Sequence, residues 1–444
     1  MKKFLIVAPG SYDGHIGGGQ KYVQDLAFEL LSRGNSVTVI EELREKNQHS
    51  TNQTSNRTIS GVHIISVHFP LVGESIKEQK SQTGQQRREF LQDIIKKIAP
   101  DYIHINGMIP PMVAACNVLN IPYLVVCHHP GEVCPKGDLL RWDNSICNEK
   151  PSTNICPKCV IRCQKRNNLV GTVLSYMPIF FHQFVGQILI KHNPFGYLGR
   201  VLMIPWFAHL KLLGLKAYLK EAKKIVAPSN AMAKALINSG VSQEHIAIVS
   251  HGITPLLQSE IKNLENRPLK FAYVGRIDYA KGVHLLLEAM ELADINKRAE
   301  LHIYGDTTNK SDEKFWQKQI KKAKKPPWLH LHGAFNHSDI NKIYAGIDVL
   351  LLPSIYLEVF GLVVAEAMSA GRPALVTDCG GPSQQVTDGV DGWVVDANDV
   401  GKLAEKIRWL SKNPSVVLEA AKNTRLKKDH KQYVDEIEKL LISL

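Results

Sequence analysis

Residues 353–368 read PSIYLEVFGLVVAEAM and carry the strongest fold signal of the chain. The preceding residues, Asp348 to Leu352, predict a buried strand, and a helix is expected to start near Gly361. In open α/β sheets, ligands bind beyond the carboxyl ends of the strands, and the amides of a helix N-terminus suit a diphosphate. Glu358 in the loop and Glu366 in the helix are placed to accept hydrogen bonds from sugar hydroxyls. Taken alone, such a pair is also typical of a solvated loop glutamate and a helix-surface glutamate favoured by the helix dipole.

A second motif, VGRIDYAKG at residues 274–282, follows an expected strand at 271–274 and places two cations at its carboxyl end. Arg276 can bind two phosphate oxygens at once and Lys281 can act as a point charge, so together they suit a departing nucleotide diphosphate. Alone, each would be interpreted as a solvated surface cation. Near the N-terminus, Gly17-Gly18-Gly19 lets the backbone approach a ligand closely, which is a weak signal in isolation.

Short apolar strands alternate with helices along the whole chain, which is typical of parallel sheets covered on both faces. The first series has expected strands at 4–8, 37–40, 62–67, 102–105 and 123–126, helices at 21–33 and about 85–98, and a polar loop at 44–60. The second has expected strands at 271–274, 301–304, 329–331, 349–352 and 374–377. The sequence therefore predicts the α/β class with two domains.

We expect these domains at residues 1–250, with an insert at about 131–217, and at 268–424. Residues 425–444 are expected to form a helical segment that packs back toward the first domain.

The composition is that of an ordinary globular protein. Of the 444 residues 44% are hydrophobic and 22% charged, which excludes a small stapled scaffold and a disordered chain. The net charge of +12 by itself fits nucleic acid, an anionic membrane or a phosphorylated substrate. Its position is more informative, because residues 158–224 hold eleven basic residues and one acid, Glu221. The rest of the chain is nearly neutral.

Together these motifs resemble the family 4 retaining glycosyltransferases of GT-B fold, also called glycosyltransferase group 1. The resemblance covers nearly the whole chain in order, and its second-domain motifs are specific. It rests on Gly17-Gly18, Arg33-Gly34, Ala227-Pro228-Ser229, Gly275-Arg276, Lys281-Gly282, Pro353-Ser354, Glu358 and Glu366 with seven residues between them, and Gly380-Gly381. It implies two facing Rossmann-like domains, with the acceptor site mainly in the first and a nucleotide-sugar site mainly in the second, and no catalytic metal.

Carried over by position, the resemblance implies a role for each motif residue. Glu366 would bind the donor ribose and Glu358 the transferred sugar, while Arg276 and Lys281 hold the diphosphate. His128 would lie near the reacting sugar. The other implied donor contacts are Gly17, Gly18, Phe360, Gly361 and Leu362, of which the last three offer backbone amides. Two positions depart from the family pattern: His129 stands where many relatives have aspartate, and Gln384 replaces the usual glutamate after Gly380-Gly381.

The implied reaction is retaining transfer of a hexose from a nucleotide-diphosphate sugar to a saccharide or polyprenyl-linked saccharide, in surface polysaccharide or glycoconjugate synthesis. Retention without an obvious enzymic nucleophile favours front-face transfer, in which a phosphate oxygen takes the proton of the acceptor. One alternative is a non-catalytic GT-B scaffold or nucleotide-sugar-binding subunit at the membrane. A zinc-containing nucleic-acid-binding protein is disfavoured, because the basic region is rich in aliphatic residues and no finger or helix-turn-helix pattern occurs.

Five of the eight cysteines fall within residues 134–163. Cys156 and Cys159 form a close pair, and Cys134 with Cys147 can complete a tetrahedral thiolate site for a structural zinc ion, leaving Cys163 as a spare. The alternative is a set of buried reduced thiols. Either use suits a reducing cytoplasm.

Residues 169–190 carry no formal charge, and residues up to 215 mix aromatic and aliphatic side chains with lysines. This pattern favours an interfacial segment on an anionic membrane. The alternatives are two ordinary core helices or an internal span, which the interior Pro178 and His182 disfavour. The start, MKKFLIVAPG, is interpreted as a buried strand rather than a secretory signal. We therefore expect a cytoplasmic protein that is peripheral on the inner face of the cell membrane.

Overall fold

The structure is a computed structural model. It describes every residue except 9, 14–17, 44–52, 69–75, 108, 165–172, 175, 179, 183, 186–187, 189–195, 263 and 296, and only the backbone of 18, 43, 53, 76–84, 164 and 196–201. The chain divides into two compact units. The N-terminal unit comprises residues 1–137, 148–250 and 430–444, and the C-terminal unit comprises 138–147 and 251–429.

The described residues of the N-terminal unit form a sheet of eight strands in the order β3-β4-β2-β1-β5-β6-β7-β8. Among the described strands β3 pairs antiparallel with β4, and the others pair parallel. Their bounds are β1 (Lys3–Ala8), β2 (Ser36–Leu43), β3 (Gln53–Ile59), β4 (Val62–His68), β5 (Tyr102–Asn106), β6 (Tyr123–Val126), β7 (Ile225–Ala227) and β8 (Ile246–Ile248).

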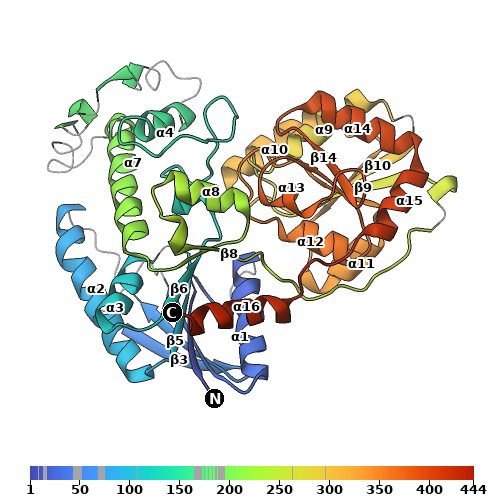
Figure 1. The fold of residues 1–444 in the computed structure, drawn as a ribbon. Coiled ribbons are helices and arrows are strands. Elements are labelled where there is room, and N and C mark those ends of the chain that lie inside the picture. The colour runs from blue at the N-terminus through green and yellow to red at the C-terminus, as the bar shows by residue number, and fades with distance from the viewer. Residues whose placement is uncertain are drawn as a thin grey trace. The chain divides into compact units, whose positions relative to one another are not determined.

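Helices cover both faces of this sheet, with α1 and α16 on one side and α2 and α3 on the other (Figure 1). The described helices are α1 (Gly18–Ser32), α2 (Ile76–Ile98), α3 (Pro110–Leu119), α4 (Cys156–Gln164), α7 (Gly196–Glu221), α8 (Asn230–Asn238) and α16 (His430–Ile442). Tyr433, Val434 and Ile437 of α16 are buried in the same core as Val23 and Leu26 of α1. Arg33, just beyond α1, binds Asp435 and Glu438 at 2.6 and 2.7 Å. The last helix of the chain is thus part of the N-terminal unit.

The C-terminal unit contains a parallel sheet of six strands in the order β11-β10-β9-β12-β13-β14. These are β9 (Leu269–Val274), β10 (Ala299–Tyr304), β11 (Leu329–Gly333), β12 (Val349–Leu352), β13 (Ala374–Thr377) and β14 (Gly392–Val395). The helices are α9 (Val283–Ala293), α10 (Lys310–Lys322), α11 (Ile340–Ala345), α12 (Leu362–Ser369), α13 (Gly381–Gln385), α14 (Val400–Lys412) and α15 (Pro414–Asn423). Figure 1 shows α9 and α14 on one face of the sheet and α11 and α12 on the other. The predicted α/β class, with two sheet-containing domains, is confirmed by this fold.

The prediction of a loop at residues 44–60 is wrong in part. Residues 53–59 of the polar segment 44–60 form strand β3, and Arg57 of β3 pairs in register with Ile64 of β4. An edge strand needs only one partner and one buried face, so its polar sequence QTSNRTI gives no apolar run to detect.

Candidate functional site

Two loops of the C-terminal unit meet at the carboxyl ends of neighbouring strands. The loop after β9 ends at Gly282, which has a left-handed backbone with φ of +70° and precedes helix α9. A Cβ at Gly282 would lie 2.0 Å from the carbonyl oxygen of Pro353, directly after β12. Only glycine permits this approach, and it brings Lys281 next to the loop that carries Glu358.

Lys281 and Glu358 form an ion pair. The Lys281 ammonium donates to both carboxylate oxygens of Glu358, at 2.8 and 2.7 Å. Ser354 donates its hydroxyl to Oε2 of Glu358 at 3.2 Å, and the Lys281 ammonium lies 5.2 Å from the ring centre of Tyr356. The two charged side chains are only 15% and 12% exposed. The pair is therefore largely withdrawn from water.

Burial and charge act in opposite directions on this pair. Burial alone would raise the pKa of the Glu358 carboxyl, but the Lys281 ammonium and the hydrogen bonds to the carboxylate hold that pKa below its ordinary value. Burial would likewise lower the pKa of Lys281, but Glu358 raises it. Both groups are consequently charged at neutral pH, and the pair has no net charge.

The backbone of Glu358 is fixed by the loop after β13. Its N–H donates to Cys379 O and its carbonyl accepts from Gly381 N, each at 2.8 Å. Gly381 has no room for a side chain, because a Cβ there would lie 2.4 Å from the carbonyl oxygen of Val359. Gly361, with φ of +84°, then turns the chain into α12. The expected amide donors Gly361 and Leu362 thus lie at the N-terminus of α12, as the sequence predicts.

The remaining site residues of this unit lie on the same two loops and on α12. Arg276 is on the loop after β9, with its side chain 60% exposed and 4.0 Å from Asp278. Glu366 lies one turn into α12 and accepts a hydrogen bond from the buried Tyr344 hydroxyl at 3.0 Å. Phe360 is buried and packs edge-on against His251. The structure therefore brings Lys281 and Glu358 into direct contact, and it carries Arg276 and Glu366 on the adjoining elements.

His128 belongs to the N-terminal unit, where it follows β6. Its Nε2 donates to Asn106 Oδ1 at 2.9 Å, and Asn106 donates its own amide to the carbonyl oxygen of Val7. This orientation of Asn106 fixes the proton of His128 on Nε2. Burial lowers the pKa of His128 to about 4, so the imidazole is neutral at pH 7.

Glu132, which the sequence analysis does not single out, is hydrogen-bonded to the backbone of this histidine. Its Oε1 accepts from the His128 backbone N–H at 3.0 Å, and its side chain is almost fully buried. Burial raises the pKa of Glu132 to about 7. A motif search misses it because the loop sequence HHPGE gives no sign that this carboxyl turns inward.

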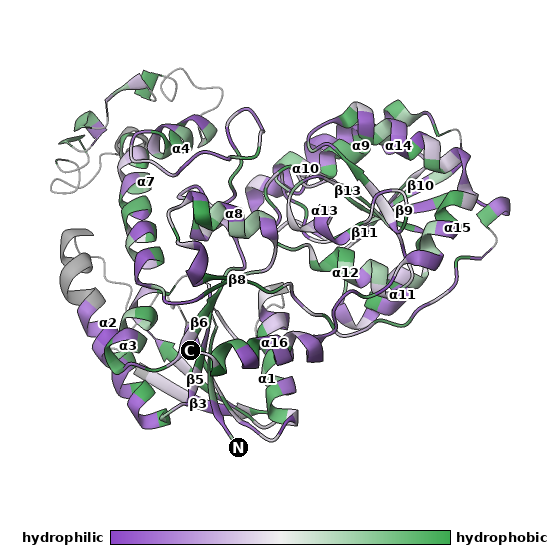
Figure 2. Cartoon of the chain, in the orientation of Figure 1, coloured by the Kyte–Doolittle hydropathy of each residue, from purple (hydrophilic) through white to green (hydrophobic). Residues whose placement is uncertain are grey.

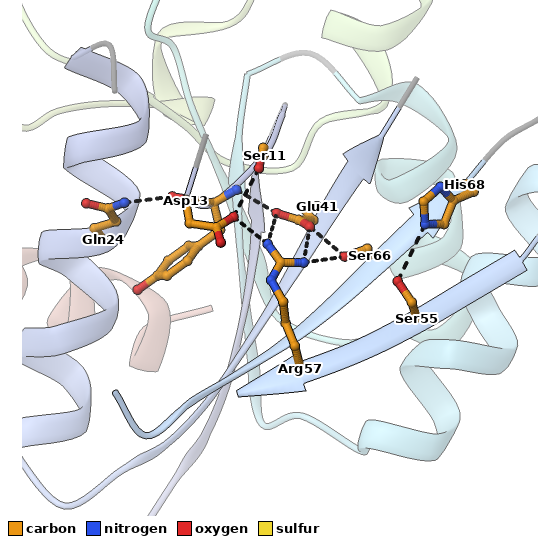
Figure 3. Close-up of polar contacts among 9 residues, drawn as sticks. Ser11, Asp13, Gln24, Glu41, Ser55, Arg57, Ser66 and His68 are labelled. Carbon is orange, nitrogen blue, oxygen red and sulfur yellow. Dashed lines mark hydrogen bonds and ion pairs between the residues drawn. The ribbon is translucent and has the colours of Figure 1, made fainter. Parts of the chain in front are cut away.

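A second polar cluster of the N-terminal unit joins β2, β3 and β4 (Figure 3). The fully buried Glu41 accepts from Arg57 at 2.6 and 3.2 Å, from Ser66 at 2.5 Å and from the Tyr12 backbone N–H at 2.5 Å. Arg57 also binds Asp13 at 2.6 Å. This cluster fixes residues 12 and 13 just before the Gly-rich turn. Gly17 lies outside the described residues, and Gly18 is the first residue of α1.

The four proposed zinc ligands are divided between the units. Cys134, Cys156 and Cys159 belong to the N-terminal unit, and Cys147 belongs to the C-terminal unit. Cys156, Cys159 and Cys163 lie on α4, where the sulfur atoms of Cys159 and Cys163 are 4.0 Å apart. The zinc site stays a prediction.

The segment at residues 169–215, for which the sequence predicts membrane contact, lies partly outside the described residues. Helix α7 within it alternates hydrophobic and hydrophilic residues (Figure 2), and buries Met203, Leu212, Leu215 and Tyr218. Along the described parts of the chain, every helix is too short or too polar to cross a membrane.

Comparison with known proteins identifies the family. Residues 257–433 match the profile of the group 1 glycosyl transferases, and residues 16–154 match that of glycosyltransferase family 4. The lipopolysaccharide 1,2-N-acetylglucosaminetransferase of Salmonella typhimurium is 28% identical over 183 residues, which are 38% of this chain and 48% of that protein. The chain spans about half or less of the length of the curated relatives that it matches.

Two solved structures share the fold over essentially their whole length. Sucrose-phosphate synthase from Thermosynechococcus elongatus has a TM-score of 0.68 at 17% identity, covering 100% of this chain and 99% of that one. HepE from Anabaena, solved in complex with UDP-glucose, has a TM-score of 0.63 at 16% identity, covering 100% of both chains. The two profile matches and these folds show that the chain belongs to the group 1, family 4 glycosyltransferases of GT-B fold.

Proposed function

We propose that the protein is a retaining glycosyltransferase. It transfers a hexose from a nucleotide-diphosphate sugar to a saccharide or polyprenyl-linked saccharide, in the synthesis of a surface polysaccharide or glycoconjugate. The observation that carries this proposal is the Lys281–Glu358 pair beside the N-terminus of α12, at the carboxyl ends of β9 and β12. The relative from Salmonella and the UDP-glucose complex of HepE support the acceptor class and the donor class, respectively.

In this proposal each charged side chain of the site binds a different part of the donor. The Lys281–Glu358 pair is neutral as a whole, so Arg276 supplies the net positive charge for the diphosphate, assisted by the third N–H of Lys281 and the amides of Gly361 and Leu362. Glu358, kept ionised by Lys281, accepts hydrogen bonds from hydroxyls of the transferred sugar. Glu366, oriented by Tyr344, accepts from the ribose hydroxyls.

Transfer then follows a front-face path. The bond from the anomeric carbon to the leaving diphosphate breaks as the acceptor oxygen approaches the same face, and a phosphate oxygen takes the acceptor proton. Arg276 and Lys281 stabilise the charge on the leaving group. Neutral His128, with its proton fixed on Nε2 by Asn106, serves as a positioning group for the sugar rather than as a cation. These steps need no metal ion.

A panel of nucleotide sugars tests the proposal. Each donor is scored by thermal shift and by slow hydrolysis, and NMR of the released sugar reports the anomer. We expect one donor to be hydrolysed with its anomeric configuration retained, and this activity to fall at least 100-fold in Lys281→Met. Inversion of the anomer, or no binding to any donor in the panel, would remove the assignment.

We further propose that the N-terminal unit binds the anionic inner face of the cell membrane. Five apolar side chains between residues 173 and 188 are exposed at helical spacing: Val173, Tyr176, Phe180, Phe184 and Ile188. Exposed aromatic residues beside a strongly basic region fit adsorption to anionic lipid. Such a surface suits a lipid-linked acceptor.

Flotation with vesicles of phosphatidylglycerol and phosphatidylcholine tests this membrane proposal. Phe180→Glu with Phe184→Glu should abolish flotation, whereas Leu257→Glu, at an exposed apolar residue of the C-terminal unit, should not. Equal flotation of both variants, or no flotation of the wild type, contradicts membrane binding.

For the cysteines we retain the proposal of a structural zinc ion bound by Cys134, Cys147, Cys156 and Cys159. Cobalt substitution tests it, because thiolate ligands give intense charge-transfer absorption. The bands should vanish in Cys156→Ser with Cys159→Ser. Their absence from the wild-type protein would favour reduced thiols instead.

A further inference from the structure

Strands β10 and β11, at the edge of the C-terminal sheet, carry a second group of titratable side chains. Along β10 the buried residues alternate with half-buried ones, so Glu300 and His302 share a face of the sheet. His330 of β11 stands directly opposite His302 in the parallel register. None of these residues has a part in the donor site described above.

The three side chains converge on one point. Glu300 Oε2 lies 3.2 Å from His302 Nε2 and 3.9 Å from His330 Nε2. The rings of His302 and His330 stack with their centroids 4.6 Å apart and their planes at 20°. One ligand atom from each residue lies within 4.8 Å of the other two. Ligands about 2.1 Å from a tetrahedral zinc ion stand roughly 3.4 Å apart, so only small side-chain rotations are needed to hold one ion.

A ring nitrogen of His330 is a second, independent observation that points to a missing ligand. Its Nε2 is buried and, within the described part of the chain, lacks a hydrogen-bond partner. Leaving a buried polar atom unpaired is unfavourable, and this one faces a carboxylate at 3.9 Å. A cation between the two groups would satisfy both.

Two further side chains, His332 and Tyr304, lie next to the three candidate ligands. Nδ1 of His302 lies 3.0 Å from Nε2 of His332, and the ring of Tyr304 stacks on His332 with centroids 4.0 Å apart. When His302 binds a metal through Nε2, its proton resides on Nδ1 and is donated to His332. Such a partner fixes the tautomer and orientation of a ligating histidine.

We propose that Glu300, His302 and His330 bind one zinc ion, with His332 as a positioning residue and a water molecule at the fourth coordination position. Two imidazoles and one carboxylate form a ligand set that zinc accepts. The ion would fasten the edge strand β11 to β10 just before the point where their register shifts, between Ile303 and Tyr304. Because zinc would bind the folded unit preferentially, it would raise the thermal midpoint of that unit.

The test uses full-length protein treated with a chelator and then titrated with zinc chloride or cobalt chloride. Bound zinc is counted, the thermal midpoint is followed by tryptophan fluorescence, and cobalt absorption separates the sites, since nitrogen and oxygen ligands give no thiolate charge-transfer band. We expect His330→Ala and Glu300→Gln each to lose one equivalent of zinc and the zinc-dependent rise in midpoint. Any thiolate band from the cysteines should remain in both variants.

Two further variants complete the experiment. His332→Ala should keep the equivalent of zinc but bind it 10- to 100-fold more weakly. His245→Ala is the matched control, because His245 is an exposed histidine that lies 4.0 Å from Glu244, and the described residues place no third metal-binding side chain beside this pair. Circular dichroism without metal verifies that every variant folds. Zinc stoichiometry and midpoint shift equal to wild type in both His330→Ala and Glu300→Gln would overturn the proposal.

Discussion

Removing the ammonium of Lys281 should destabilise the C-terminal unit strongly. The two N–O distances to Glu358 are 2.8 and 2.7 Å, and both side chains are at most 15% exposed. At an effective dielectric constant of about 20, unit charges about 3 Å apart attract by about 5 kcal/mol, and desolvation of both groups offsets part of this. Leaving one such charge buried and unpaired costs about 3–5 kcal/mol. Lys281→Met should therefore lower the free energy of unfolding by about 3–4 kcal/mol at pH 7.

A double-mutant cycle isolates the pair. Glu358→Gln is expected to cost less than Lys281→Met, because the ring of Tyr356 and the carboxylate of Asp278 remain near Lys281. The double variant should be more stable than the sum of the single losses predicts, with a coupling of about 2–4 kcal/mol.

Urea unfolding followed by tryptophan fluorescence measures the free energies of this cycle in the C-terminal unit, to which both residues belong. Five of the six tryptophans, all except Trp206, belong to the C-terminal unit. The matched control is the pair Lys342–Asp339, whose 3.3 Å contact is exposed to solvent, so its coupling should be close to zero. A Lys281–Glu358 coupling no larger than that of the control pair would refute the reasoning.

Three other changes have defined outcomes. Folding raises the pKa of Glu132 to about 7, so its contribution to stability is present below its ordinary pKa and is lost as the pH rises through 7. As the pH rises from 5 to 8.5, the free energy of unfolding of Glu132→Gln should therefore increase by up to about 3 kcal/mol relative to that of the wild type. Thermal unfolding followed by circular dichroism measures this difference, and stability profiles that stay parallel across the pH range would contradict it. Tyr433→Phe removes one hydrogen-bond partner of the Tyr22 hydroxyl, which still has His104 Nε2 at 3.0 Å. The free energy of unfolding should therefore fall by about 1 kcal/mol in the same assay, and a loss above about 3 kcal/mol would contradict this. Gly282→Ala would place a Cβ 2.0 Å from the carbonyl oxygen of Pro353, so limited proteolysis should detect an opened C-terminal unit, and wild-type resistance would contradict the close packing.

Apolar periodicity was sufficient to predict most of the sheet strands. The runs at 123–126, 349–352 and 374–377 coincide with β6, β12 and β13, because buried parallel strands need continuous apolar residues. Strand β14 was missed, since GWVV is short and follows a turn sequence that reads as a loop. Strand β3 was missed because its stability comes from a neighbour and from the Arg57–Glu41 contact rather than from its own apolar residues.

The candidate site shows the same division between local and long-range information. The motifs indicated which strand ends carry Arg276, Lys281 and Glu358, because a loop after a strand is a local feature. They did not indicate that Lys281 binds Glu358, since the two are 77 positions apart in sequence and meet only through the close approach of Gly282 to Pro353. Glu132 was missed for a related reason, because its raised pKa depends on burial.

Isothermal titration of the nucleotide diphosphate of the accepted donor into Arg276→Met measures the donor site with least disturbance of the fold. The Arg276 side chain is 60% exposed and can be removed without opening a cavity. Loss of a charge-assisted contact worth about 1.5–3 kcal/mol should weaken binding about 10- to 100-fold. Lys342→Met, which removes an 85% exposed cation elsewhere in the same unit, should leave the dissociation constant unchanged. Wild-type affinity in Arg276→Met would contradict a diphosphate site at the ends of β9 and β12.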